Sequence, residues 1–500
     1  MLRRDFLTAL AALTATAPVR AGAVGAEMPF STDLLMDRVR AMARERYRPR
    51  PMVPEAWRNL TYDQYRKIWF AERNALWSGE DSAIKVDFFA PGLYFPRAIK
   101  VFAVEGDVAA QVPFSLDDFD TTDKFPDLPV DDTLGFSGFR LRAETERAGI
   151  FQEFLVMQGG TYFRGIGTGQ IYGISARGLA IDTADPKGEE FPDFTEFYIE
   201  RPAAGARVFN VHAILDSPGV AGLYSFEIAH GLPLRMRVTA RLIPRRRLTH
   251  VGLGPLTSMF QFDGTNRDRF SDFRPAVHDS DGLMIRNGRG ETLWRPLANP
   301  KTLQVSAFID DNPRGFGLMQ RARKFSDFAD LEALYHRRPS LWITPEGDWG
   351  KGAVTLVEIP TEREIYDNIV AYWRPETALE PGVLHSHSYA MDWGETPPGD
   401  APLAQVVDTR MGRRYSGGYI ATIDFAPHPG LGDLADLTPS VSAKAGQVSD
   451  GLIQQNPETG GPRLAFSFDP EGAPLIEFRA QLRKAGAPAS EVWLYRWTPT

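Results

Sequence analysis

The sequence contains no cysteine in its 500 residues. This absence excludes disulfide bonds, zinc sites built on thiolates and a cysteine nucleophile. Histidine is also scarce, with 8 residues. Only His385 and His387 lie close together in the sequence, and no carboxylate or third histidine lies at ligand spacing from them. We therefore expect no bound metal and no other cofactor.

An excess of positive charge and the common nucleotide and hydrolase motifs are lacking as well. The net charge of −8 argues against nucleic acid, whose phosphates attract clustered basic side chains. The glycine-rich run at 165–169 lacks the lysine of a phosphate-binding loop, and we expect a tight bend there, followed by a strand at 171–174. The chain also lacks the Gly-x-Ser-x-Gly motif of serine hydrolases.

Long hydrophobic runs are missing beyond the N-terminus, so we expect no membrane span. Residues 1–26 combine Arg3 and Arg4, an apolar stretch at 6–18 and a small-residue site at 21–23. This pattern predicts a signal peptide, and the adjacent arginines favour twin-arginine export over an ordinary secretory signal. We therefore expect a protein located in the periplasm.

Short strands separated by turn residues fill the chain from about residue 84 to residue 389. In the clearest strand, 234–242, apolar residues alternate with arginine and threonine, as in a β-sandwich. The absence of alternating helices and strands argues against a parallel α/β sheet. Before the strands, residues 31–46 predict an amphipathic helix and residues 61–65 a short helical turn.

A chain of 500 residues exceeds what one hydrophobic core usually serves, so we expect two domains. The best linker is 395–402, with three prolines in eight residues. It divides a large β-sandwich at 27–394 from a second domain at 403–500. Alternating apolar residues at 476–482 and 493–497 fit an immunoglobulin-like sandwich in the second domain.

Acidic, aromatic and arginine residues crowd into residues 271–373, interleaved with glycine and proline. Cleavage of a glycosidic bond needs one carboxylic acid and one carboxylate base, among rings that stack on sugars. Any one of these acids could instead cap a turn. The acidic candidates are Asp279, Asp281, Asp310, Asp311, Asp348, Glu364 and Asp367.

Asp367 is distinguished by the pattern around it. Residues 364–373 predict a strand with a carboxylate inside it. If Ile365 and Ile369 face the core, Asp367 faces inward with them. Burial would raise the pKa of this carboxyl group, which is what a general acid requires.

Several motifs are similar to those of the periplasmic glucans biosynthesis protein family, the G and D proteins. The resemblance covers nearly the whole mature chain, and the twin-arginine start is more similar to the D protein. The motifs are LTYDQY at 60–65, GISARGLAIDT at 173–183, FRPAVHDSDGL at 273–283, LWRPL at 293–297, NPRGFG at 312–317 and GDWGKG at 347–352.

The resemblance implies an all-β protein, with a large galactose-mutarotase-like β-sandwich followed by a smaller immunoglobulin-like β-sandwich. The family acts on osmoregulated periplasmic glucans, whose backbone is β-1,2-linked glucose, and some members are inverting endo-β-1,2-glucanases. Residues 27–394 would then form the glucan-binding and catalytic domain. The alternative is a non-catalytic protein that binds the nascent glucan and presents it to other enzymes.

The resemblance also implies roles for individual residues. Asp367 corresponds to the general acid and Asp279 to the general base acting through a water relay, with Asp281 as the alternative base. Tyr335 and Glu364 would lie near the acid and the relay. The expected partner is β-1,2-glucan. The sequence leaves open whether the chain also forms a homodimer or binds other glucan-synthesis proteins. Residues expected to bind the sugar are Arg274, His278, Asp281, Trp294, Asp348 and Trp349.

Overall fold

The computed structural model describes residues 25, 27–120, 127–399 and 401–499. The predicted signal peptide, apart from Gly25, lies outside the described residues. Within the described ranges, the structure has no helix that is both long and apolar enough to cross a membrane.

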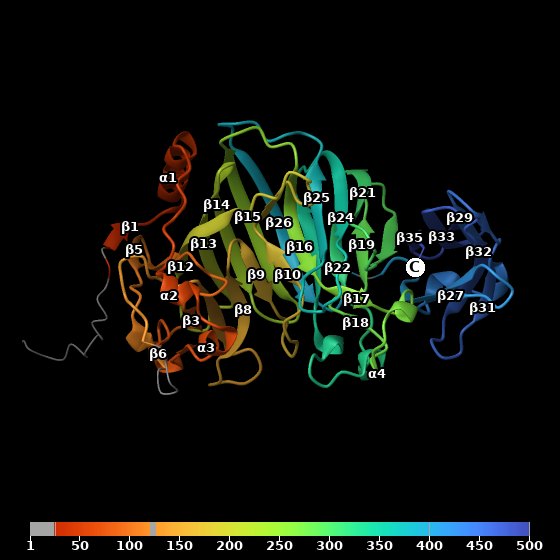
Figure 1. Cartoon of the computed structure of the whole chain (residues 1–500), viewed down its shortest axis with the longest axis horizontal. Coiled ribbons are helices and arrows are strands. Elements are labelled where there is room, and N and C mark those ends of the chain that lie inside the picture. Colours follow the sequence, from red (N-terminus) through yellow and green to blue (C-terminus); the bar gives the residue numbers. More distant parts are fainter. Residues whose placement is uncertain (1–24, 26, 121–126, 400, 500) are drawn as a thin grey trace, which may run out of the picture.

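Two large β-sheets face each other across the main hydrophobic core, so the predicted all-β sandwich fold is confirmed (Figure 1). One sheet runs, in spatial order, through β1 (Glu27–Pro29), β5 (Val108–Gln111), β4 (Lys100–Glu105), β12 (Asp193–Glu200), β13 (Val208–Asp216), β14 (Val220–Ala229), β15 (Leu234–Pro244), β26 (His385–Gly394), β23 (Ser340–Glu346), β22 (Gly315–Met319), β19 (Gly282–Arg286), β20 (Thr292–Pro296), β35 (Val492–Trp497), β33 (Ile476–Lys484) and β29 (Leu437–Ala443), with β34 (Ala487–Pro488) on β33.

The facing ten-stranded sheet carries the candidate site on the surface turned away from the core. Its order is β21 (Gln304–Asp311), β24 (Lys351–Glu358), β25 (Ile369–Pro375), β16 (Val251–Ser258), β10 (Ser175–Arg177), β9 (Tyr162–Gly165), β8 (Gln152–Gln158), β7 (Gly138–Ala143) and β3 (Ile84–Phe89), with β11 (Leu179–Ile181) on β16. Two short ribbons complete this body, β17 (Phe260–Phe262) with β18 (Val277–His278) and β2 (Trp69–Phe70) with β6 (Phe119–Asp120).

Side-chain alternation builds the core as the sequence predicted. In β15, Leu234, Met236 and Val238 are buried, whereas Arg235 and Arg237 are exposed. Successive side chains of a strand point to opposite faces, so one face of β15 joins the core and the other carries charge. The predicted strand at 234–242 is therefore confirmed.

The predicted N-terminal helix is present as α1 (Thr32–Arg44). The Ser31 side chain caps it by accepting a hydrogen bond from the backbone of Leu34 at 3.2 Å, and Leu35 and Val39 are buried under it. The helical turn predicted at 61–65 is α3 (Tyr62–Tyr65), capped by Thr61. The described residues also form the α-helices α2 (Glu55–Arg58) and α4 (Phe325–Phe328).

Two strand predictions are corrected. Residues 165–169 do bend between β9 and β10, but residues 171–174 adopt no strand. The strand predicted at 364–373 begins only at Ile369, because residues 364–366 form a turn. In both places the local alternation resembles a strand, but the backbone pairs with no neighbouring strand.

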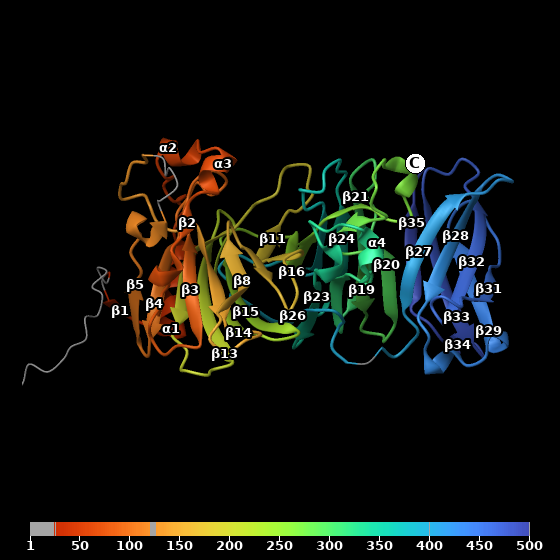
Figure 2. The ribbon, with the colours of Figure 1, turned by 90° about the horizontal axis from the view of Figure 1, so that it is seen from below.

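The C-terminal strands lie at the end of the molecule opposite α1 (Figures 1 and 2). Strand β35 pairs in parallel with β20, so the larger sheet continues into this part of the chain. A second core joins it to a five-stranded sheet. The predicted linker at 395–402 falls between the end of β26 and the start of β27, and the domain boundary itself stays a prediction. The five strands are β27 (Val406–Arg413), β28 (Tyr419–Phe425), β32 (Pro462–Asp469), β30 (Gln447–Val448) and β31 (Leu452–Gln455).

Candidate active site

Asp279 lies directly after β18 and is almost fully buried. Its backbone N–H donates to the carbonyl of Met259 at 2.8 Å, and its side chain, 6% exposed, forms an ion pair with Arg338. Burial raises the pKa of Asp279, Arg338 opposes that rise, and the negative charge of Asp367 adds to it. The carboxylate of Asp367 is therefore close enough to influence the ionisation of Asp279.

Asp367 lies in the turn before β25, so the prediction that it is buried within a strand is wrong. Its side chain is 28% exposed, and Ile365, expected in the core, is 72% exposed. Thr257 of β16 donates a hydrogen bond to Asp367 Oδ2 at 3.3 Å. The guanidinium of Arg164, from β9, lies 3.7 Å from the same oxygen. Asp367 thus sits over the outer surface of the ten-stranded sheet.

The position of this turn is set by Asn368, which is buried. Its amide group bonds both the backbone N–H and the carbonyl of Phe260, at 2.8 and 2.9 Å, and also the carbonyl of Ile359 at 3.0 Å. Because Phe260 belongs to the β17–β18 ribbon that leads into Asp279, Asn368 connects the two segments that carry the carboxylates.

Tyr335 and Glu364 are joined by a hydrogen bond. The Tyr335 hydroxyl donates to Glu364 Oε2 at 3.2 Å, and the guanidinium of Arg274 lies 2.7 Å from that oxygen. Burial, followed by the negative charge of Glu364, raises the pKa of Tyr335, so its hydroxyl stays protonated. Arg338 lies 4.3 Å from the centre of the Tyr335 ring and links this pair to Asp279.

The structure therefore brings together five of the residues expected to act on the sugar, namely Arg274, Asp279, Tyr335, Glu364 and Asp367.

Three other expected residues point away from this cluster. His278 precedes Asp279 on the chain and lies on the opposite side of the strand, between the rings of Phe260 and Phe328. Asp281 accepts hydrogen bonds from the backbone of residues 321 and 322, and Trp294 packs under Arg321. All three line a different cavity, at the junction with the C-terminal strands.

Asp348 and Trp349 lie in the turn between β23 and β24. Asp348 is exposed and accepts a hydrogen bond from the backbone of Gly350 at 2.9 Å. Trp349 is buried in the main core and donates to the Ser388 carbonyl at 3.2 Å. Trp349 is therefore a packing residue, and Asp348 stabilises its turn.

Three residues of the cluster were not predicted from the sequence. Arg338 belongs to the arginine-rich part of the 271–373 stretch, but nothing local connects it to Asp279. Thr257 and Arg164 come from strands far away in the chain. Only Arg164 offers a local signal for its place in the site. It is a charged residue within a short strand, between Phe163 and Gly165, and in the structure it is exposed while both neighbours are buried.

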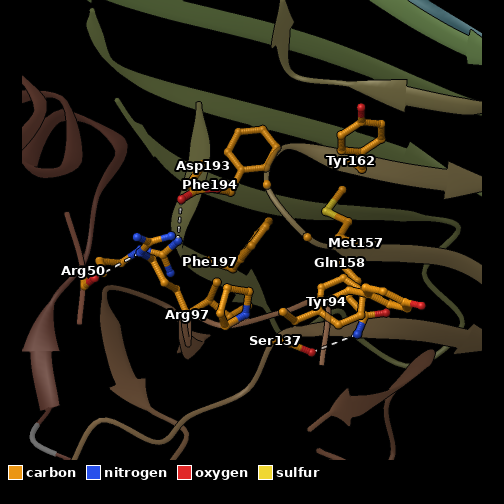
Figure 3. A pocket seen from close by; sticks show the side chains of 15 residues that line it. Arg50, Tyr94, Arg97, Ser137, Met157, Gln158, Tyr162, Asp193, Phe194 and Phe197 are labelled. Carbon is orange, nitrogen blue, oxygen red and sulfur yellow. Dashed lines mark hydrogen bonds and ion pairs between the residues drawn. The ribbon is translucent and has the colours of Figure 1, made fainter. Parts of the chain in front are cut away.

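A small pocket of about 130 Å³ is lined in part by Tyr162 (Figure 3). Arg50 and Asp193 form an ion pair at 3.0 Å on one side of it, and the rings of Tyr94 and Tyr162 lie on the other. Burial raises the pKa of Tyr162, and the charges of Arg177, Glu189 and Asp367 act on it more weakly.

Asp182, Asp185 and His250 offer three ligand atoms within 4.8 Å of one another. Each already has a protein partner. Arg246 lies 3.2 Å from Asp182, the backbone of Lys187 donates to Asp185 at 2.8 Å, and His250 Nε2 lies 2.8 Å from the Tyr372 hydroxyl.

The fold and the site define an all-β protein whose ten-stranded sheet carries neighbouring, differently buried carboxyl groups among arginines and a tyrosine. The family model described as "Periplasmic glucan biosynthesis protein, MdoG" matches residues 30–497. The chain belongs to this family.

Curated relatives support the assignment over the full length. The chain is 44% identical over 504 residues to glucans biosynthesis protein G of Bradyrhizobium diazoefficiens, covering 100% of both proteins. It is 44% identical over 475 residues to the protein of the same name from Vibrio cholerae, covering 94% of this chain and 87% of that one. The likeness to the D protein, which depended on the twin-arginine signal alone, is not borne out, because these relatives carry the name G.

Proposed function

We propose that this chain is an inverting endo-β-1,2-glucanase of the periplasm, which cuts the backbone of osmoregulated periplasmic glucans. The observation that carries the proposal is the pairing of Asp279, buried beside Arg338, with Asp367, open to solvent beside Arg164. Inverting glycosidases use two carboxyl groups, one as acid and one as base, with room for water between them. Family membership supports glucan as the substrate.

In the proposed reaction, the protonated Asp367 donates its proton to the glycosidic oxygen as the bond to the anomeric carbon breaks. A water molecule attacks that carbon from the opposite face, and its proton passes through water to Asp279. Tyr335 and Glu364 lie beside this route and are hydrogen-bonded to each other. A buried base such as Asp279 fits transfer through water better than direct contact with the sugar.

Asp367 must be protonated to act as the acid, although it is exposed. A sugar bound over the turn removes water from the carboxyl group, and desolvation favours the neutral form. Exposed rings flank the turn, with Tyr366 56% and Phe273 80% exposed. Farther along the sheet, Tyr94 is 74% exposed beside the Tyr162 pocket. Such rings suit stacking on a long glucan chain.

A second candidate function is non-catalytic binding, with the glucan held for other enzymes. The ion pair between Asp279 and Arg338 favours it, because a carboxylate held by a guanidinium is a weaker base. Both functions would use the same surface, so they are separated by whether the glucan becomes shorter.

The test uses the mature chain and its Asp367→Asn variant with linear β-1,2-glucan. We expect the wild type to release shorter oligosaccharides, and the variant to lose cleavage by about 100-fold or more while it still binds the glucan. Asp311→Asn, which changes an exposed aspartate in β21, is the matched control and should cleave normally. Equal cleavage by Asp367→Asn and the wild type would rule out Asp367 as the acid.

A further inference from the structure

A second cavity, of about 710 Å³, lies where the large sandwich meets the C-terminal strands. Residues 263–267, 275–281 and 321–327 form its walls on the sandwich side, and residues 407–411 of β27 close it from the C-terminal side. The exposed side chains of Lys324 and Val407 stand at its rim. Small-molecule sites usually occupy about 300–1,000 Å³, so this cavity has room for a ligand of two or more sugar units.

Two polar side chains of the cavity each have one buried atom without a hydrogen bond among the described residues. Asp281 accepts the N–H groups of Arg321 and Ala322 through Oδ2, each at 3.0 Å, while its buried Oδ1 has no hydrogen bond among the described residues. His278 is 2% exposed, and its buried Nδ1 has no hydrogen bond within the described part of the chain, although the ring interacts with the side chain of Gln320. A buried polar atom without a hydrogen bond destabilises the fold, so both positions favour a ligand with hydroxyl groups.

The charges of the lining favour a neutral ligand. Five basic side chains are accompanied by four acidic ones, which leaves little net charge to attract a phosphate or a metal cation. Burial raises the pKa of Asp281 to about 6 and that of Asp263 to about 7, and it lowers the pKa of His278 to about 3, so the ring of His278 is neutral. The charged residues are Arg267, Arg321, Arg323, Lys324 and Arg410, with Asp263, Asp281, Asp327 and Asp408.

The cavity is separate from the carboxylate cluster but adjacent to it. His278 and Asp279 are consecutive, and their side chains point to opposite sides of the backbone. Arg323, in the cavity wall, donates hydrogen bonds to the Arg338 carbonyl and, at 3.1 Å, to Ser340. Arg338 in turn holds Asp279, so the same segment of chain borders both places.

We propose that this cavity is a second, non-catalytic binding site for a neutral oligosaccharide, with Asp281 and His278 as the groups that bond its hydroxyls. The site does not depend on cleavage at Asp367. It depends on the proposed function only for the choice of probe, which is a linear β-1,2-linked glucose oligosaccharide.

The test compares hydrogen–deuterium exchange of the full mature chain with and without the probe, in the Asp367→Asn background to prevent cleavage. We expect protection of residues 321–327 and 407–411, in addition to protection near 364–368. Protection near 364–368 alone would overturn the second site while leaving the proposed function standing. Protection of the cavity alone would support the second site and contradict the proposed function. Protection at neither place would overturn both.

A single substitution then tests the assigned group. In Asp281→Asn the amide oxygen can keep the two backbone bonds, while the amide nitrogen replaces the acceptor Oδ1 with a donor. We expect the probe to bind the cavity about tenfold more weakly, or weaker still, and the protection near 364–368 to be unchanged. Asp310→Asn, which changes another carboxylate bonded to backbone N–H groups, is the matched control.

A second variant covers the case in which Asp281→Asn does not fold. Val407→Trp adds bulk to the cavity wall from β27 and leaves the residues proposed to bind the hydroxyls, His278 and Asp281, unchanged. It should abolish protection of residues 321–327 by the probe. Undiminished protection there in either folded variant would overturn the assignment.

Discussion

At the scale of single residues, Asp279 and Asp367 differ because of what surrounds each carboxyl group. Asp279 is buried and paired with Arg338, whereas Asp367 is partly exposed and lies 3.7 Å from Arg164. Burial outweighs the arginine at Asp279, so its pKa is raised. The proposed base must be ionised, so this rise works against its role, and Arg338 is the group that opposes the rise.

The pH dependence of cleavage should respond to Arg338. Arg338 lowers the pKa of Asp279, so Arg338→Met should raise that pKa further. The proposed base must be ionised, and activity is lost as the pH falls through its pKa. The acidic limb of kcat/KM against pH should therefore move upward by about one unit or more.

Arg337→Met is the control for this shift. Arg337 is the neighbouring residue, and its guanidinium bonds the Gly169 carbonyl and not a carboxylate of the cluster. Its pH profile should match that of the wild type. An acidic limb that stays in place, or moves downward, in Arg338→Met would contradict the role of Asp279 as the base.

Asp87 provides a residue-scale test of stability. It is fully buried between Arg140 and Arg142, at 2.8 and 2.9 Å. Asp87→Asn removes the carboxylate that Arg140 and Arg142 share, although each keeps one other carboxylate, Glu153 or Glu72. It should lower the free energy of unfolding by about 2–3 kcal/mol in denaturant titrations. Asp63→Asn, in an exposed pair with Arg66, should change it by less than about 1 kcal/mol. Equal effects would contradict the buried network.

At the scale of elements, the turn before β25 determines where Asp367 lies. The turn is fixed by Asn368, whose three hydrogen bonds reach Phe260 and Ile359. Phe260 is 108 residues away in the sequence, so no local pattern reveals this contact. For that reason the alternation at 364–373 predicts a continuous strand, while the structure has a turn followed by a shorter strand.

Asn368→Ala should therefore affect both stability and activity. It leaves the buried backbone groups of Phe260 unpaired, which should lower the free energy of unfolding by about 2–3 kcal/mol. If Asn368 positions Asp367, kcat should fall more than KM rises in the remaining folded protein. Asn59→Ala, on an exposed turn, is the control. A stable variant with normal kcat would contradict the positioning role.

Elements with strong local alternation were predictable, and β15 and β33 match their predicted faces. The helix predicted at 31–46 and the helical turn predicted at 61–65 are likewise present as α1 and α3. What could not be predicted is pairing between distant strands. The parallel contact of β20 with β35, which continues the larger sheet into the C-terminal strands, is one example.

At the scale of the whole molecule, a buried ion pair joins the sandwich to the C-terminal strands. Glu491, 1% exposed, bonds both terminal nitrogens of Arg321 at 2.8 Å and the backbone of Val406 at 2.9 Å. Glu491→Gln should lower the free energy of unfolding by about 3 kcal/mol, because it leaves a buried guanidinium uncompensated. Glu458→Gln, on an exposed turn, is the control. Equal unfolding curves for the two variants would contradict a structural role for this pair.

The sequence could predict those candidate site residues that lie in or near motifs of the family. The resemblance pointed to Asp279, Tyr335, Glu364 and Asp367, and the structure places them in one cluster. It could not tell that Asp281, two residues after Asp279, faces a different cavity. Which side of a short strand faces which space depends on the packing of the whole molecule.

The central claim is that this chain cleaves β-1,2-glucan with inversion, and proton NMR of the first products tests it most directly. The mature chain is mixed with linear β-1,2-glucan, and the anomeric signals of new reducing ends are followed before mutarotation equilibrates them. We predict shorter glucans whose new reducing ends appear first as the α-anomer. A glucan of unchanged length, or new ends that appear first as the β-anomer, would contradict the account.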